Sequence, residues 1–567
     1  MRNLMLCLAA GALLAAGTGA ATAQQAVTIN GVQASQVVIA PADSPLAQAI
    51  KDKLTSLYYG GKPGTTAYAD AQKLYFFYGA RHFEPIWLKA AVDGSATLSP
   101  TADKIIDVFK NAETEGFRPS DYLTPAIESP AGSDVASQAT LETAFAMAAI
   151  HYAHDAYMGR IAPEAVSNAI DPETKELDVT GLLGQLLNTD SPEKVLAALD
   201  PQGREFGALK AALAKLDAGT AAPTPVVIPA GPLLRPGMQD PRVALLRQRL
   251  NVAAPETDAD TYDDALVTAV EAFQTGAGTA ADGIVGPGTL AALNRVSNSK
   301  ITRDDIIANM ERWRWLPSDL GPFYVMVNIP EFRVAVMQND APAFSTRVVV
   351  GKPDTPTPVF SNAIKYIVVN PYWNIPASIV AKEIKPHMLA NPDYLARDNM
   401  QLVSGSHVID PASIEWASVT QSNWRYTVRQ LPGPDNALGQ IKFLFPNDHD
   451  VYLHDTPSKP LFATAVRAYS HGCVRVQYPM DFANAVLQDE PGLTVDQLKA
   501  MFGPSERWVS LKNHVPVHIA YFTLRADADG TLKSFADIYG HNQRLIALLD
   551  GKALPATRSK TPIVSGV

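Results

Sequence analysis

The stretch FYVMVNIPEFRVAVMQ (323–338) decides what the C-terminal half of the chain can form. It holds two apolar, partly alternating runs separated by a PE pair, which is typical of two strands joined by a short turn. FSTRVVVG (344–351) and AIKYIVVNPYW (363–373) continue the same pattern. The sequence therefore predicts a mainly-β unit that begins near residue 301.

Two further segments complete this β unit. PVHIAYFTLRADADGTLKSFADIYG (516–540) predicts two closing strands joined at the DADG turn. Between about residues 375 and 426 the strand rhythm is broken by helical and polar stretches such as ASIVAKEIKPHMLANPDYL (377–395). We predict that this piece is an α-containing insertion folded over the β unit as a lid.

The preceding part of the chain has a helical texture. KLYFFYGARHFEPIWL (73–88), TADKIIDVFKNAETEGF (101–117) and LETAFAMAAIHYAHDAYMGRI (141–161) carry apolar residues three to four apart. We predict an all-α domain over residues 43–216 with no visible chemistry. A Pro/Ala/Thr-rich stretch at 217–232 is expected to be an extended linker.

Residues 233–296 predict a small unit of two helices, a Gly-rich turn and a last short helix. Val243, Leu246 and Leu250 share one helix face, and Leu266, Val270 and Phe273 share another. The segments AVEAFQ (269–274) and DGIVGPGTLAALN (282–294) resemble the small peptidoglycan-binding domain found beside many cell-wall enzymes. A purely structural three-helix spacer is the alternative.

Length and composition allow several folded domains. The chain has 567 residues, of which 47% are hydrophobic and 18% charged, so it is too long for one ordinary core. Its net charge of -10 argues against nucleic acid as the main partner, because phosphate binding needs a basic face.

The N-terminus predicts export. Arg2, the apolar run LMLCLAAGALLAA and the small residues ATA at 21–23 fit a cleavable signal peptide over residues 1–23. No later segment reaches the length of a membrane-spanning helix, so we expect a periplasmic or cell-envelope protein with no membrane span. Cleavage would remove Cys7 and leave Cys473 as the one cysteine.

That cysteine lies in HDTPSKPLFATAVRAYSHGCVRV (454–476). A thiol attacks as the thiolate, so an enzyme must supply a base, and His454 at the end of a strand-like run and His471 are both candidates. Gly472 would let backbone N–H groups approach a developing oxyanion. The alternative is that Cys473 is a small buried apolar residue.

These residues resemble the signature of the L,D-transpeptidase catalytic domain, the YkuD type, in its multidomain YcbB-type branch. The likeness covers most of residues 301–545, which leaves 546–567 as a C-terminal tail. Besides SHGCVR (470–475), it is carried by VVVGKPDTPTPVFS (348–361), NPYWNIPASI (370–379), RQLPGPDNALGQIKFLFPN (429–447), YLHDTP (452–457) and YFTLRADADG (521–530).

The resemblance implies acyl transfer on peptidoglycan stem peptides without a cofactor or metal. Cys473 would attack the carbonyl of the third stem residue and expel the terminal D-alanine. An amine of a neighbouring stem would then resolve the thioester and give a 3-3 cross-link. A lipoprotein lysine, a free D-amino acid or water are other acceptors used in the family.

Residue roles follow from the same resemblance. His454 would be the base, oriented by a backbone carbonyl, so Asp455 need not complete a triad. The N–H groups of Gly472 and Cys473 would form the oxyanion hole. The expected catalytic group is Cys473, His454, His471, Ser470 and Gly472.

The expected substrate-binding residues fall in the family motifs. Arg475 is suited to hold a substrate carboxylate, although a buried salt bridge would account for it equally well. Trp373 fits a core position as well as a substrate platform. The predicted set is Arg475, Tyr372, Trp373, Asn374, Asn436, Lys442, Asn447 and Tyr452.

Two other classes of function compete. A zinc-dependent peptidoglycan peptidase could use HDVYLHD (449–455) with His514 and His518, but this matches no familiar zinc pattern and leaves SHGC unexplained. A non-catalytic wall-binding scaffold would be expected to lack the cysteine or the upstream histidine, and both are present.

Overall fold

The computed structural model describes residues 28–29, 32–33, 39–90, 96–129, 133–218, 226, 228–250, 252–255, 258–277, 281–295, 301–527 and 530–552. The predicted signal peptide, most of the predicted linker and the end of the predicted tail lie outside the described residues. The chain divides into two compact units. One comprises 1–104, 124–150 and 178–192, and the other 105–123, 151–177 and 193–567.

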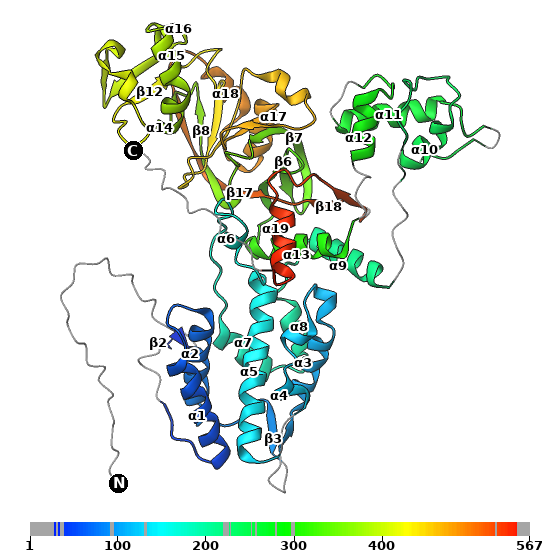
Figure 1. Ribbon diagram of the computed structural model, residues 1–567, viewed down its shortest axis with the longest axis vertical. Coiled ribbons are helices and arrows are strands. Elements are labelled where there is room, and N and C mark those ends of the chain that lie inside the picture. The colour runs from blue at the N-terminus through cyan, green and yellow to red at the C-terminus, as the bar shows by residue number, and fades with distance from the viewer. Residues whose placement is uncertain are drawn as a thin grey trace. The chain divides into compact units, whose positions relative to one another are not determined.

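The first unit is helical, as expected for the N-terminal domain (Figure 1). Side chains of Ser44 and Thr65 cap its first two helices by accepting backbone N–H groups. Its elements are β1 (Thr28–Ile29), β2 (Val32–Gln33), α1 (Pro45–Gly60), α2 (Thr66–Gly79), α4 (Pro125–Glu128) and α7 (Val179–Leu187), with the first parts of α3 (Pro100–Lys110) and α5 (Val135–Met158).

One predicted helix is shorter than its sequence pattern suggested. The apolar pattern over 73–88 continues past Gly79, but α2 ends there, and His82 and Phe83 have positive φ angles of 59° and 58°. Residues in that conformation cannot continue a right-handed helix. A hairpin of β3 (Leu88–Ala90) and β4 (Ala96–Leu98) follows instead.

The small helical unit has the predicted three helices, α10 (Pro241–Leu250), α11 (Asp264–Ala277) and α12 (Pro287–Arg295). Val243, Leu246, Leu266 and Val270 are fully buried in its core, as their helical spacing predicted.

The C-terminal β unit is built on a nine-stranded sheet in the order β15-β7-β16-β14-β13-β8-β17-β5-β6. Because β6 also pairs with β7, the sheet closes on itself. The first two strands are those predicted at 323–338. The strands are β5 (Phe323–Asn328), β6 (Arg333–Gln338), β7 (Ala341–Gly351), β8 (Phe360–Val369), β13 (Ile441–Leu444), β14 (Leu453–His454), β15 (Ala468–Ser470), β16 (Val474–Val476) and β17 (Arg507–Ala520).

The predicted insertion forms a layer with its own core. Its helical part is joined by a four-stranded sheet, β11-β10-β12-β9, that the sequence pattern did not predict. Figure 1 shows its helices gathered beside β12. The elements are β9 (Trp373–Ile375), α14 (Ala377–Ile379), a π-helical turn (Val380–Ile384), α15 (Lys385–Ala390), α16 (Tyr394–Arg397), β10 (Met400–Ser404), β11 (His407–Ile409) and β12 (Thr427–Gln430).

The same compact unit contains several further helices. A capping box of Thr302 and Asp305 begins α13 (Arg303–Trp315). The hairpin of β18 (Leu524–Ala526) and β19 (Leu532–Ser534) spans the predicted DADG turn. The remaining helices are α6 (Pro163–Val166), α8 (Pro192–Ala197), α9 (Arg204–Asp217), α17 (Pro479–Val486), α18 (Val495–Ala500) and α19 (His541–Leu549).

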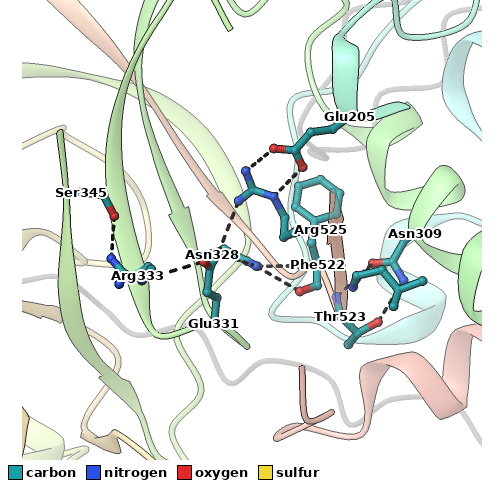
Figure 2. A network of polar contacts seen from close by, with 10 residues as sticks. Glu205, Asn309, Asn328, Glu331, Arg333, Ser345, Phe522, Thr523 and Arg525 are labelled. Carbon is teal, nitrogen blue, oxygen red and sulfur yellow. Dashed lines mark hydrogen bonds and ion pairs between the residues drawn. The ribbon is translucent and has the colours of Figure 1, made fainter. Parts of the chain in front are cut away.

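A buried polar network ties α9 to the sheet (Figure 2). Arg525 is ion-paired with Glu205 of α9 and, at 3.5 Å, with Glu331 of the β5–β6 turn. Asn328 exchanges two hydrogen bonds with the backbone of Phe522, at 2.8 and 3.1 Å. Each charge in this network therefore has a partner of opposite sign.

A search of the described residues finds no helix both long enough and apolar enough to cross a bilayer.

Candidate active site

The register of three neighbouring strands brings the predicted chemistry to one face of the sheet. His454 on β14 is paired with Lys442 on β13 and with Arg475 on β16. Because side chains alternate along a strand, Cys473 shares the face of Arg475, and Tyr452 that of His454. The intervening residues Leu453 and Val474 point into the hydrophobic core. The register of the paired strands thus determines which side chains of the site share one face of the sheet.

The imidazole of His454 has a fixed tautomer. Its Nδ1 lies 2.5 Å from the backbone carbonyl oxygen of Asp455, and a carbonyl accepts only, so Nδ1 carries the proton. The other ring nitrogen, Nε2, is left as a proton acceptor. Burial, together with the positive charge of Arg475, lowers the pKa of His454 to about 3. The ring is therefore neutral at pH 7.

Asp455 holds this carbonyl in place. One of its carboxylate oxygens accepts the N–H of Gln440 at 3.0 Å, and the other is 2.6 Å from the ammonium of Lys459. A Cβ on Gly439 would approach this carboxylate to 2.3 Å, so the turn needs glycine here. The side chain of Asp455 thus positions the turn, while its backbone contacts His454.

Cys473 is half-buried and has no disulfide partner. Its thiol lies 3.7 Å from the carbonyl oxygen of Asp450. Burial raises the pKa of Cys473 to about 11, although hydrogen bonds from Tyr452 and the charge of Arg475 oppose the rise. The free protein therefore holds a neutral thiol at Cys473 and a neutral imidazole at His454 on the same face of the sheet, and the thiol must lose its proton when it attacks.

The turn before Cys473 is held by Ser470. Its Oγ donates to the carbonyl of Cys473 at 2.6 Å and accepts the N–H of Gly472 at 3.1 Å. The Gly472 N–H, expected to bind the oxyanion, is thus already engaged, whereas the N–H of Cys473 has no hydrogen bond among the described residues. Gly472 has a φ of 125°, so backbone conformation, more than space, requires glycine.

His471 lies in a different environment from His454. Its Nε2 is 2.7 Å from Oε1 of Glu383, which belongs to the π-helical turn of the insertion. Both side chains are partly exposed, at 35% and 48%. This ion pair connects the insertion to the residue two positions before the cysteine.

The two cations that flank His454 have few partners. The nearest carboxylate to the Lys442 ammonium is that of Glu506, at 4.0 Å. That carboxylate already accepts the N–H of Tyr372 and the indole N–H of Trp508, each at 2.9 Å. Arg475 has a buried Nε without a hydrogen-bond partner. Among the described residues, neither cation is therefore hydrogen-bonded to a carboxylate.

The other predicted substrate-binding residues do not converge on the thiol in the same way. Asn436 is buried. Its side-chain amide donates a hydrogen bond to the carbonyl of Pro371 and accepts one from the backbone N–H of Leu438 in its own turn. Asn447 likewise bonds only the backbone of residues 445–451. Trp373 packs against the core of the insertion, while Asn374 is exposed on β9.

The donor atoms of the zinc alternative are separated. His449 pairs with Asp171 at 2.9 Å, and Nδ1 of His518 lies 2.8 Å from the hydroxyl of Ser361. The part of the chain that the structure describes contains no group of three His, Cys, Asp or Glu side chains that could hold a metal ion.

Three contacts of the site had no signal in the sequence. Glu383 lies in a segment without a recognisable motif, and Glu506 sits in an ordinary SERW run. The carbonyl of Asp450, which faces the thiol, depends on a positive φ of 53° that its residue type alone does not reveal.

Family models match three parts of the chain. Residues 322–499 match the L,D-transpeptidase catalytic domain, residues 72–213 the Scaffold domain, and residues 239–293 the "Putative peptidoglycan binding domain".

A curated protein of Haemophilus influenzae, described as "Putative L,D-transpeptidase", is 32% identical over 248 residues. The match covers 44% of this chain and 50% of the relative, so the chain spans about half the length of the curated relative it matches.

Solved structures with detectable likeness include two L,D-transpeptidases. That of Xylanimonas cellulosilytica (residues 123–326) is 18% identical, with a TM-score of 0.18, and covers 51% of this chain and 98% of its own. That of Mycobacterium smegmatis is 12% identical, with a TM-score of 0.17, and covers 35% and 58%. TM-scores this low carry no argument about the site.

Proposed function

We propose that this chain, whose residues 322–499 match the L,D-transpeptidase catalytic domain, is a cysteine acyltransferase acting on peptidoglycan stem tetrapeptides. The observation that supports this most is the shared face of β14 and β16. There the thiol of Cys473, one residue before β16, and the imidazole of His454 on β14, with its fixed tautomer, lie inside the region that matches the family.

The first half-reaction follows from the neutral pair. Nε2 of His454 takes the thiol proton as the sulfur of Cys473 attacks the carbonyl carbon of the third stem residue. The N–H of Cys473 donates to the developing oxyanion. The bond to the terminal D-alanine then breaks, the imidazolium returns the proton to the leaving amine, and a thioester remains on Cys473.

The second half-reaction reverses these roles. An amine of a neighbouring stem attacks the thioester, its proton passes to His454, and the thiolate leaves and is reprotonated. The product is a 3-3 cross-link. A lipoprotein lysine, a D-amino acid or water would follow the same steps, because only the acceptor differs.

The remaining regions fit a wall-acting protein. The match over residues 239–293 supports peptidoglycan as the partner of the small helical unit, and the N-terminal pattern supports export to the cell envelope.

The direct test uses muropeptides that contain tetrapeptide stems. The wild-type protein should release D-alanine and form 3-3 linked dimers, and Cys473→Ala should do neither while keeping the unfolding temperature of the wild type. Normal product formation by Cys473→Ala would refute the proposal. Activity that is lost on treatment with EDTA but resists thiol reagents would favour the zinc alternative.

A further inference from the structure

Lys442 has the surroundings of a ligand-binding cation. It is 9% exposed and lies on the face of the sheet that carries His454. Its ammonium is 5.6 Å from the ring centres of both Tyr452 and Trp508. Among the described residues its single anionic neighbour is Glu506, at 4.0 Å, which is too long for a hydrogen bond.

Glu506 is poorly placed to neutralise this charge. Its two carboxylate oxygens each accept one hydrogen bond at 2.9 Å, from the backbone N–H of Tyr372 and from the indole of Trp508. These bonds hold the carboxylate where it is. The Lys442 ammonium, taken out of water, thus keeps hydrogen-bonding capacity that no described residue uses.

Arg475 stands on the opposite side of the same histidine. It is paired with His454 across β14 and β16, and Lys442 is paired with His454 across β13 and β14. The Nε of Arg475 is buried without a partner, and no described residue forms an ion pair with its guanidinium. Two cations therefore lie one strand either side of the base, and their charges are at most partly compensated.

A buried charge without a partner is costly, so the missing counter-charge belongs to whatever occupies the site. We propose that Lys442 and Arg475 form a two-point carboxylate-binding site that recognises two separate carboxylates of the acyl donor, one on each side of His454. This rests on the proposed function. The donor offers two such groups near the scissile bond, namely the terminal carboxylate of the leaving residue and the side-chain carboxylate of a dicarboxylic third residue.

The geometry also explains why both cations are needed. His454 must reach the scissile amide, so a donor bound in the productive pose runs across the histidine. Groups on the two sides of that amide then face β13 and β16 respectively. A single cation would fix one end of the donor and leave the reacting carbonyl free to rotate away from the sulfur.

The test measures D-alanine release from three synthetic donors: the tetrapeptide L-Ala-γ-D-Glu-meso-diaminopimelate-D-Ala, its terminal amide, and its amide at the side-chain carboxylate of the third residue. For the wild type, kcat/KM should fall roughly 10- to 150-fold for each amide, the range expected when one charge-assisted hydrogen bond is lost. For the side-chain amide, release of D-alanine is monitored directly. For the terminal amide, release of D-alaninamide is monitored.

Lys442→Met keeps the aliphatic stem and removes the charge. This variant should discriminate against only one of the two amides, and Arg475→Met should discriminate only against the other. Lys442→Arg should recover discrimination in part. Lys499→Met, which alters an exposed lysine of α18, should keep the wild-type pattern because the Lys499 ammonium already pairs with Asp496 on its own helix.

Because the result is a ratio between donors, a partly unfolded variant still gives an answer. Equal turnover of all three donors by the wild type would overturn the inference while leaving the proposed function intact. Unchanged discrimination in Lys442→Met would overturn it as well. No release of D-alanine from any donor by the wild type would instead count against the proposed function.

Discussion

Two sets of buried charges in this protein are arranged in opposite ways. Around Arg525, the guanidinium lies between the carboxylates of Glu205 and Glu331, so opposite charges meet. Around His454, the part of the chain that the structure describes gives Lys442 and Arg475 a single ion-pair partner, the carboxylate of Glu506 at 4.0 Å from Lys442. Paired charges stabilise the fold. Charges without a partner of opposite sign are expected to receive that partner from a bound ligand. Under the proposed function, the first set stabilises the protein and the second binds its substrate.

The largest expected effect belongs to the substrate-facing set. His454→Gln keeps an N–H that can donate to the Asp455 carbonyl but removes the proton acceptor. We expect D-alanine release to fall by about 10³-fold, within the range for general-base catalysis, because the thiol would have no base. The free energy of unfolding should change by less than about 1 kcal/mol. A loss of activity explained by loss of folded protein would contradict this.

Changes around Arg525 should lower stability and leave activity unchanged, the opposite of the result expected for His454→Gln. Arg525→Met leaves Glu205 and Glu331 facing each other in a largely buried place. We expect the protein to lose about 3 kcal/mol of stability, which is typical when one partner of a buried ion pair is removed. Thermal or urea unfolding measures this. Below the unfolding transition, kcat/KM of Arg525→Met should equal that of the wild type. A selective change in donor preference would show that Arg525 also affects substrate binding, and would contradict the comparison.

The neutral state of the pair predicts an unusual pH profile. Because the pKa of His454 is lowered to about 3 and that of Cys473 is raised to about 11, kcat/KM should show no acid limb near pH 6.5. Measuring D-alanine release from pH 5 upward in constant ionic strength checks this. An inflection near pH 6.5 would contradict this expectation.

The same lowered pKa affects stability with a definite sign. Unfolding lets His454 take up a proton below its ordinary pKa near 6.5, so stability falls as the pH drops from 6.5 toward 3. His454→Gln should reduce that slope by up to about 1.4 kcal/mol per pH unit. His518 and His541, whose pKa values burial lowers to about 4, contribute in the same direction and remain in both proteins. Unfolding at several pH values provides the comparison, and equal slopes would contradict it.

The smallest effect is expected at the insertion. Glu383 and His471 are both partly exposed, and such ion pairs contribute little. Glu383→Gln should change KM for the tetrapeptide by no more than about fivefold, with stability unchanged. The change should shrink at high salt. A loss of kcat comparable to that of His454→Gln would show that this pair takes part in the chemistry.

Much of the architecture could be predicted from the sequence because it is written in local patterns. Alternating strands at 323–338, the helical faces around Val243 and Val270, and the helical part of the insertion follow from periodicity and turn residues, whereas the insertion's own four-stranded sheet does not. The end of α2 could not be predicted in this way, because the apolar spacing continues beyond Gly79 while the backbone turns at His82 and Phe83.

The candidate site was less accessible to sequence reasoning. The SHGC motif draws attention to Cys473, and His454 precedes it in the sequence. That the two residues share one face of the sheet depends on the pairing of β14 with β16, which local patterns do not show. For the same reason, the sequence could not show that Asn436 and Asn447 are occupied by their own turns, or that Glu383 reaches His471. Domain boundaries and residue roles remain predictions.

The central claim is that Cys473 becomes acylated by the third stem residue with the help of His454. Intact-protein mass spectrometry after brief mixing with the tetrapeptide donor tests it most directly. The account predicts a mass increase equal to the donor minus D-alanine, located on the peptide that contains Cys473 and absent in Cys473→Ala and His454→Gln. Release of D-alanine by the wild type, with no such adduct even when the acceptor is withheld and the reaction is quenched in acid, would contradict it.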